Sequence, residues 1–248
     1  MTNLCYLYDG SWDGLLTAVF RAYEKKQNPV AVLAQDGAQL QLHWQSVYIE
    51  TDETLSRRVE SGLIKKLGSP FLKKIGTAFL SMDMDKGTII YHYIHAGLEI
   101  GRQIYTALAH PAVLEIDRIC LHISREAHLL LGFVRFSRME NGIYFSKITP
   151  KNSVVPLLMP HFADRFSDQP FIIYDERHGI AGIYDLSDWN LVETSELNLP
   201  PLSDDEKEYR KLWKLFYNSV AIAERTNPKC RRNHMPKRYW ENLTEFLP

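Results

Sequence analysis

Two rhythms of hydrophobic and polar residues alternate along the chain. Near the N-terminus, short apolar runs predict strands over residues 4–8, 30–34 and 47–51. Between the first two runs, apolar residues recur at helical spacing as far as Lys26. Ser11 or Asp13 can cap this helix, and Pro29 follows its end.

The helical rhythm then dominates the chain from Asp52 onward. We expect four helices, over residues 52–67, 70–80, 86–108 and 111–131. Gly97 and Gly101 either weaken the third of these helices or mark the close approach of a neighbouring helix.

The second half of the chain changes to a strand rhythm. Apolar runs over 133–138 and 143–148 flank Asn141-Gly142, and this dipeptide between such runs is a strong signal for a β-hairpin. A second hairpin is expected from 171–175 and 180–185.

The remaining segments complete the expected order of elements. Between the hairpins, the second half of 150–166 is expected to be helical, with Pro160 near the start of that helix. We expect a loop over 186–203 and a long helix that Ser203 caps.

This order predicts an α+β fold. It comprises an N-terminal strand–helix unit, a central helical block, a hairpin–helix–hairpin antiparallel sheet, and a long C-terminal helix with a basic tail. The 248 residues can form a single domain over 1–248. They can also form two packed halves, of which 1–131 is mostly helical and 132–248 holds the sheet and the C-terminal helix.

Composition narrows the class of protein. The 29 basic and 30 acidic residues nearly cancel, so any affinity for nucleic acid or membranes must come from local clusters. No stretch approaches the roughly 20 apolar residues that a membrane-spanning helix needs, so we expect no membrane partner. The N-terminus shows no secretory signal, and three scattered cysteines are typical of a reducing compartment. We therefore expect a cytoplasmic protein, and we find no motif for a cofactor.

The densest cluster of charge lies near the C-terminus. Residues 225–240, called here the basic segment, contain no acidic residue and six basic ones: Arg225, Lys229, Arg231, Arg232, Lys237 and Arg238. His234, Tyr239 and Trp240 lie among these cations, and such a mixture is typical of surfaces that bind phosphates and stack on bases. Asn-Pro and Met-Pro steps are expected to keep the segment off a regular helix. The alternative is a solvated tail that docks on the acidic residues at 204–208.

Three further arginines extend the predicted nucleic-acid surface. They are Arg125 in the helix expected over 111–131, Arg135 in the apolar strand after it, and Arg165 in the following helix. An arginine inside an apolar strand needs an anion or a carboxylate partner. Glu126 and Asp164 are the internal partners that the sequence offers to Arg135.

His128, His161 and Asp164 are the candidates for acid–base catalysis. His161 and Asp164 are three residues apart, so a helix can bring them together as a base and the group that orients it. No nucleophile motif accompanies them, and a structural hydrogen bond is the alternative. His92, His95 and Glu99 share a helix face but lack a metal-binding motif and a fourth ligand, so we expect no metal site.

Long stretches of the chain resemble a bacterial family described as DNA metabolism, or DNA modification/repair, proteins. These stretches are residues 6–20, 125–128, 132–136, 156–158, 160–166, 169–175 and 231–240. The resemblance covers essentially the whole chain. It implies a gene neighbour that is a radical S-adenosylmethionine (radical SAM) protein and, in some relatives, fusion to a uracil-DNA-glycosylase-like domain. It implies no established reaction and no catalytic residues.

Three functions follow from these observations. The leading prediction is a cytoplasmic accessory protein of DNA repair or modification that contacts nucleic acid through the basic segment and the three arginines. The second is an enzyme with His128, His161, Asp164 and Arg135 around a nucleotide or nucleic-acid substrate. The third is an adaptor that docks the radical SAM protein through exposed anchors among Tyr6, Tyr8, Trp12 and Trp213.

Overall fold

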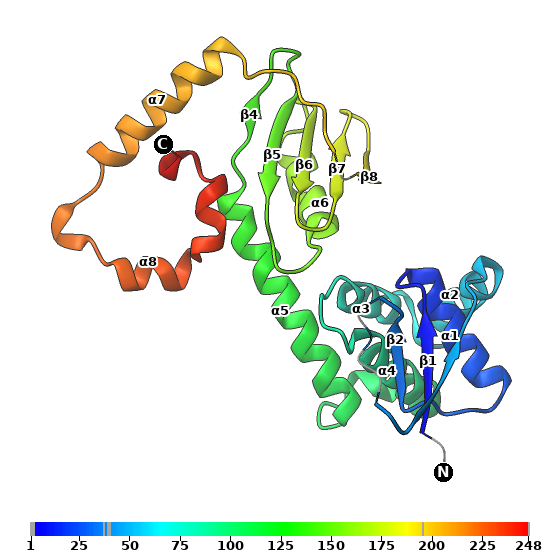
Figure 1. The fold of residues 1–248 in the computed structure, drawn as a ribbon. Coiled ribbons are helices and arrows are strands. Elements are labelled where there is room, and N and C mark those ends of the chain that lie inside the picture. The colour runs from blue at the N-terminus through cyan, green and yellow to red at the C-terminus, as the bar shows by residue number, and fades with distance from the viewer. Residues whose placement is uncertain (1–2, 37, 39–40, 195, 248) are drawn as a thin grey trace. The chain divides into compact units, whose positions relative to one another are not determined.

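The computed structural model describes the chain except for residues 1–2, 37, 39–40, 195 and 248 (Figure 1). Backbone contacts divide the chain into two compact units, residues 1–123 and 124–248. Helix α5 (Pro111–Phe133) begins in the first unit and ends in the second. The order of elements confirms the predicted α+β fold.

A three-stranded parallel sheet forms the first part of unit 1. Its strands are β1 (Asn3–Tyr8), β2 (Ala31–Ala34) and β3 (Trp44–Tyr48), in the order β2-β1-β3. Helix α1 (Trp12–Glu24) carries the chain from β1 to β2, and such a crossover makes the two strands parallel. Of the two predicted caps, Ser11 is the one the structure shows, since its hydroxyl accepts a hydrogen bond from the Gly14 amide. Strand β3 begins three residues before the predicted run.

The predicted helical block is present in unit 1. It consists of α2 (Glu53–Leu67), α3 (Ser69–Phe79), α4 (Lys86–Ile100), the 3-10 helix η1 (Gly101–Tyr105) and the start of α5. Helix α4 ends before Gly101, which adopts φ +64°, so the predicted helix to residue 108 is too long. Gly97 marks close packing, because a Cβ there would lie 2.8 Å from the Phe71 ring.

Unit 2 contains a five-stranded sheet. Its strands are β4 (Ser137–Arg138), β5 (Tyr144–Ile148), β6 (Phe171–Asp175), β7 (Ile180–Tyr184) and β8 (Trp189–Glu193), adjacent in sequence order. Both predicted antiparallel hairpins are confirmed, and Gly142 adopts φ +83° in the first turn. Helix α6 (Val155–Arg165) crosses between β5 and β6, which therefore pair in parallel.

Three local expectations for unit 2 are wrong. Pro160 lies inside α6, because Pro156 already occupies the first turn. Strand β8 forms within the predicted loop, where it pairs with β7. Arg135 is not in a strand, because α5 continues to Phe133 and residues 134–136 connect it to β4.

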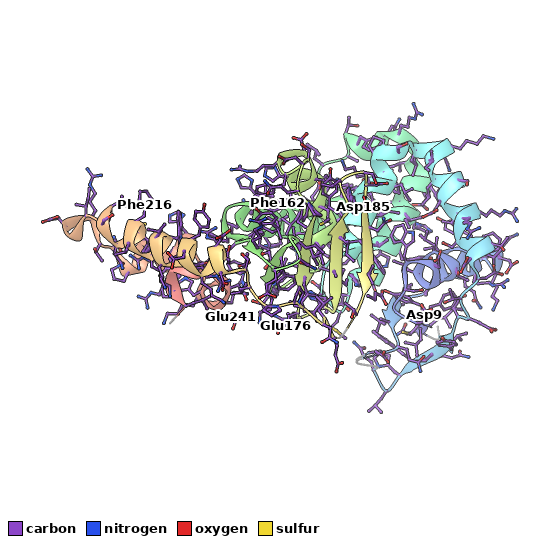
Figure 2. The ribbon with its side chains drawn as sticks, turned by 90° about the horizontal axis from the view of Figure 1, so that it is seen from above. Asp9, Phe162, Glu176, Asp185, Phe216 and Glu241 are labelled. Atoms are coloured by element: carbon purple, nitrogen blue, oxygen red, sulfur yellow. The ribbon has the colours of Figure 1, made fainter. Side chains whose placement is uncertain are left out.

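The core of unit 2 contains a cluster of phenylalanine rings. Phe136 contacts the rings of Phe162, Phe166 and Phe171 edge to face, with centroids 5.2–5.3 Å apart. Phe162, which is labelled in Figure 2, brings α6 into this cluster through its contact with Phe136. The cluster anchors the segment that follows α5, and Arg135 precedes Phe136 in that segment.

The chain after the sheet is helical. It contains α7 (Asp204–Ser219), η2 (Ala223–Arg225), α8 (Pro228–His234), η3 (Lys237–Asn242) and η4 (Thr244–Phe246). Ser203 caps α7 as predicted. Helical structure is interrupted at 226–227, as the Asn227-Pro228 step predicts, but the expectation that this step keeps the basic segment off a regular helix is wrong, because Asn227 caps α8 and proline suits its first turn. The chain turns back after α7, so that η3 lies beside the C-terminal part of α5 (Figure 1).

In the part of the chain that the structure describes, no helix has both the length and the apolar character needed to cross a bilayer.

Candidate nucleic-acid interface

The cations of the basic segment lie at the surface of unit 2. Five of its predicted contact residues are exposed: Arg231, Arg232, His234, Lys237 and Arg238. Among the described residues, Arg238 is the one basic side chain of this segment with a carboxylate within 4 Å, and that carboxylate is Glu126, at 3.4 Å. The other five cations therefore carry charge that the described protein does not neutralise.

The acidic residues at the start of α7 have partners other than the basic segment. Asp204 pairs with Lys207, and Glu206 pairs with Arg210. Asp205 lies 3.8 Å from Arg138, and Glu208 lies 3.8 Å from Lys211. The alternative of a tail docked on these carboxylates is therefore not what the structure shows.

Trp240 of the segment stacks on another ring and lies close to a cation. Trp240 stacks on Phe246, with ring centroids 4.7 Å apart and planes at 14°. Arg231 lies 6.0 Å from the Phe246 ring, and Lys237 lies 6.0 Å from the Trp240 ring. The stacked rings therefore contact two cations of the segment, Arg231 and Lys237.

Tyr239 is buried, with 2% of its surface exposed, and its hydroxyl donates to Glu126 at 2.8 Å. A buried ring offers no face to a base. We therefore reassign Tyr239 from a base contact to a residue that fixes the segment in place.

Glu126 on α5 holds the C-terminal segment against unit 2. Its Oε1 accepts hydrogen bonds from the Lys151 amide and the Tyr239 hydroxyl, at 2.8 Å each, and from Arg238. Its Oε2 accepts from the amide and the side chain of Asn152, at 2.9 and 2.7 Å. Burial raises the pKa of Glu126, but the hydrogen bonds outweigh burial and the net pKa is lowered. The carboxylate is therefore an ionised tether.

Arg135 is engaged inside unit 2. Its Nη2 lies 2.9 Å and its Nε 3.3 Å from the two carboxylate oxygens of Glu245, and its Nη1 donates to the carbonyls of Gly132 and Val134. The expected partners Glu126 and Asp164 are wrong, because η4 brings Glu245 to this place. Since all three nitrogens of the guanidinium have protein acceptors, we reassign Arg135 to a structural role.

Arg125 and Arg165 are exposed on α5 and α6. Arg165 lies 5.9 Å from the ring of its neighbour Phe166. Within the described residues, neither arginine has a hydrogen bond, ion pair or ring contact with the basic segment. Nucleic-acid contact by Arg125 and Arg165 therefore stays a prediction, and no contact in the described structure links either arginine to the basic segment.

The candidate catalytic residues His128, His161 and Asp164 are all exposed. Over the described residues, no hydrogen bond or ion pair joins His161 to Asp164, and the His161 ring instead meets the edge of Phe162. The structure therefore does not assemble the predicted pair of a base and its orienting carboxylate.

A different His–Asp pair is present in the turn between β6 and β7. The Nδ1 of His178 lies 2.5 Å from Oδ2 of Asp175, and both side chains are buried. Oδ1 of Asp175 accepts hydrogen bonds from the amides of Arg177 and His178, so the pair closes the turn. The sequence signal was an Asp-x-x-His in a predicted hairpin, which periodicity alone does not distinguish from other turns.

A cluster of three histidines lies in unit 1. A cavity of 380 Å³ is lined by His92, His95 and Glu99 on α4 and by His110 and Glu115 at the start of α5. Burial lowers the pKa of His92. Nδ1 of His95 lies 3.6 Å from the Glu99 carboxylate. No group of three such side chains in the described part of the chain is placed to hold a metal ion.

The aromatic anchors expected for an adaptor are mostly covered. Tyr6 and Tyr8 are fully buried, and Trp12 is half-buried with its indole N–H bonded to Glu60. Trp213 on α7 is 40% exposed.

Comparison with known families assigns the chain to a protein family. Residues 84–245 match the family model described as a domain of unknown function, DUF4130. The chain belongs to this family. The DUF4130 match begins just before α4, so it includes the histidine cavity of unit 1 as well as the sheet, α7 and the basic segment. A search of curated proteins found no match.

Proposed function

We propose that this protein is a cytoplasmic accessory protein of DNA repair or modification that binds nucleic acid through the basic segment. The observation that carries the proposal is the set of five exposed cations without a carboxylate partner among the described residues. The resemblance to DNA modification and repair proteins supplies the context. It also names the expected partner, a radical SAM protein, and co-purification of the two proteins tests that partnership.

Electrostatics favours a polyanion as the ligand of the basic segment. The whole chain has a net charge of −1, so this segment contrasts with the rest of the protein. Each phosphate that a lysine or arginine neutralises releases condensed counterions, and this release strengthens binding at low salt. Trp240 and Phe246 stack on each other, and Lys237 lies beside the Trp240 ring while Arg231 lies beside the Phe246 ring. Contact with a fixed ring restricts each cation before binding, which reduces the side-chain entropy lost when the cation binds a phosphate.

The test is the double variant Arg231→Glu/Arg232→Glu, measured by fluorescence anisotropy with labelled single-stranded and duplex DNA and with RNA of the same sequence. Both arginines are exposed and unpaired with acids in the described chain, so the fold should persist. We expect affinity to fall at least about tenfold. We also expect the slope of log K against log salt to decrease by about two, because each duplex phosphate contact contributes about 0.9.

The matched control is Lys65→Glu/Lys73→Glu in unit 1. Both lysines are exposed, and the two reversals change the net charge by the same amount. We expect this control to bind like the unmodified protein. Equal losses in both variants would mean that overall charge alone drives binding, and unchanged affinity in Arg231→Glu/Arg232→Glu would refute the proposal.

A further inference from the structure

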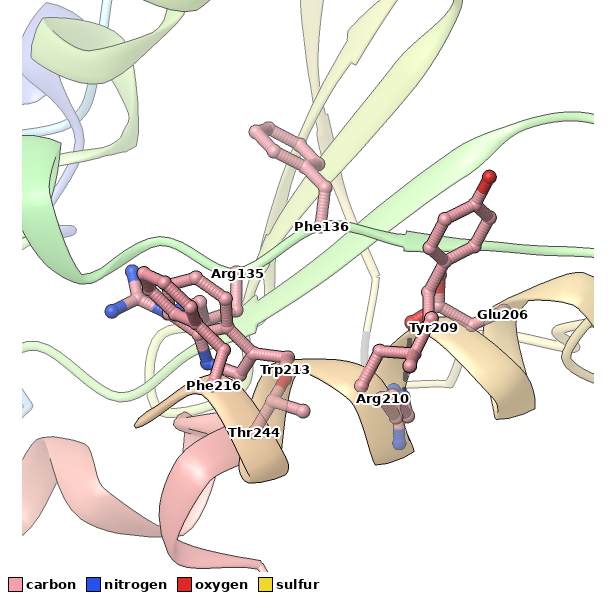
Figure 3. A pocket seen from close by; sticks show the side chains of 9 residues that line it. Arg135, Phe136, Glu206, Tyr209, Arg210, Trp213, Phe216 and Thr244 are labelled. Atoms are coloured by element: carbon pink, nitrogen blue, oxygen red, sulfur yellow. Dashed lines mark hydrogen bonds and ion pairs between the residues drawn. The ribbon is translucent and has the colours of Figure 1, made fainter. Parts of the chain in front are cut away.

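An open pocket of 630 Å³ lies in unit 2. Its walls come from α7, from residues 135–136 and from η4, and four of its lining residues are aromatic: Phe136, Tyr209, Trp213 and Phe216. Its volume falls within the range of about 300–1,000 Å³ that is typical of small-molecule sites. Figure 3 shows Trp213 and Phe216 together on α7, next to Arg135.

The aromatic side chains of α7 at this pocket are exposed rather than packed. Tyr209 is 68% exposed, Phe216 is 55% exposed and Trp213 is 40% exposed. The Trp213 and Phe216 rings lie 5.9 Å apart at 32°. Exposed apolar surface gathered in one place is typical of a binding site. Several exposed rings around a single pocket favour a flat ligand that can stack on them.

The charged groups at the pocket already have partners within the protein. Arg135 is paired with Glu245, and Arg210 is bonded to Glu206 and to the Ser137 hydroxyl. The indole N–H of Trp213 donates to Glu245 at 3.2 Å, which restricts rotation of the ring. Since the arginines at the pocket are neutralised, the pocket selects a flat, uncharged group rather than a phosphate.

The short helix η4 joins this pocket to the basic segment. Thr244 lines the pocket, and Glu245 holds both Arg135 and Trp213. Phe246 stacks on Trp240 and lies beside Arg231. Consecutive Cα atoms are about 3.8 Å apart, so Thr244 and Phe246 lie at most about 7.6 Å apart. A site for an uncharged ring thus adjoins a site for phosphates.

We infer that this pocket receives an unpaired nucleobase of a single-stranded nucleic acid whose phosphates lie on the basic segment. The inference rests on the proposed function and names the part of the nucleic acid that this second site contacts. The neighbouring cations favour this ligand over a protein, because a helix or strand of a partner would need a matching acidic surface beside its apolar one. Stacking on Trp213 and Phe216 tolerates any base, since every base has a π-face.

The test compares two labelled DNA single strands of equal length, one complete and one with abasic residues in its central positions. Both strands carry the same phosphates. We expect the abasic strand to bind about 5- to 100-fold more weakly, as loss of a base–aromatic stack requires. Trp213→Ala and Phe216→Ala should each remove most of this difference and leave the salt slope unchanged. Trp213→Phe, which keeps a ring, should retain most of it.

Leu215→Ala is the control, because Leu215 is an exposed apolar residue of α7 that does not line the pocket. It should bind both strands like the unmodified protein. Equal affinity of the unmodified protein for the two strands would overturn the inference. If Arg231→Glu/Arg232→Glu still weakened binding, the proposed function would stand.

Loss of partner co-purification in Trp213→Ala, with DNA binding unchanged, would assign the pocket to a protein and also overturn the inference. If the unmodified protein bound neither strand, the proposed function itself would fail, and this inference with it.

Discussion

Replacement of Glu126 by glutamine should detach the C-terminal segment from the rest of unit 2. The carboxylate uses both oxygens as acceptors. Oε1 receives the Lys151 amide and the Tyr239 hydroxyl, and Oε2 receives two N–H groups of Asn152. A glutamine side chain keeps one oxygen and turns the other acceptor into an NH₂ donor. Whichever way the amide is oriented, it faces at least one N–H that needs an acceptor.

The size of the effect follows from these contacts. If the NH₂ replaces Oε2, two N–H groups of Asn152 lose their acceptor. If it replaces Oε1, the Lys151 amide loses its acceptor, and in either orientation Arg238 loses its counter-charge. Leaving a buried donor unsatisfied costs about 1–3 kcal/mol, and hydrogen bonds to a charged group contribute about 1.5–3 kcal/mol each. We expect Glu126→Gln to lower the free energy of unfolding by about 3 kcal/mol.

The measurement is urea denaturation, with hydrogen exchange to localise the effect. Amides in 237–246 should exchange faster in Glu126→Gln than in the unmodified protein, because opening of this segment becomes easier. Glu176→Gln is the matched control, since Glu176 is an exposed acid paired with Lys147, and such pairs contribute about 1 kcal/mol or less. A loss below about 1 kcal/mol for Glu126→Gln, equal to that of the control, would refute this account of the tether.

Two further predictions concern packing and pH. Gly97→Ala should destabilise unit 1 by about 1–2 kcal/mol in urea denaturation, because the new methyl meets the buried Phe71 ring at 2.8 Å. The control Gly62→Ala, where a Cβ has no atom within 4 Å, should stabilise the protein by about 0.5–1 kcal/mol. A gain in stability for Gly97→Ala would contradict this packing. The pKa values of Glu126 and Glu245 lie below 4.5 in the folded protein, because hydrogen bonds to each carboxylate outweigh the effect of burial. Both ionised acids therefore stabilise the fold above about pH 4.5, and this stabilisation is lost as the pH falls through their lowered pKa values. The urea midpoint should therefore fall as the pH decreases below about 4.5, and it should fall less in Glu126→Gln. A constant midpoint would show that these carboxylates do not stabilise the fold.

Sequence alone predicted those elements whose stability depends on nearby residues. The caps at Ser11 and Ser203, and the turn at Asn141-Gly142, are interactions within about four residues, so the local pattern contains them. The helices of unit 1 follow from hydrophobic spacing, because each buries one face. The basic segment was also evident as a cluster, since charge is read directly from residue type.

Tertiary structure decided which residues of the candidate site meet. Arg135 finds Glu245 at a separation of 110 residues, and Tyr239 finds Glu126 at 113 residues. No periodicity encodes such partners, because they depend on how the chain returns after α7. For the same reason, the 40% exposure of Trp213 depends on how α7 packs against elements that are distant in sequence rather than on spacing along the chain.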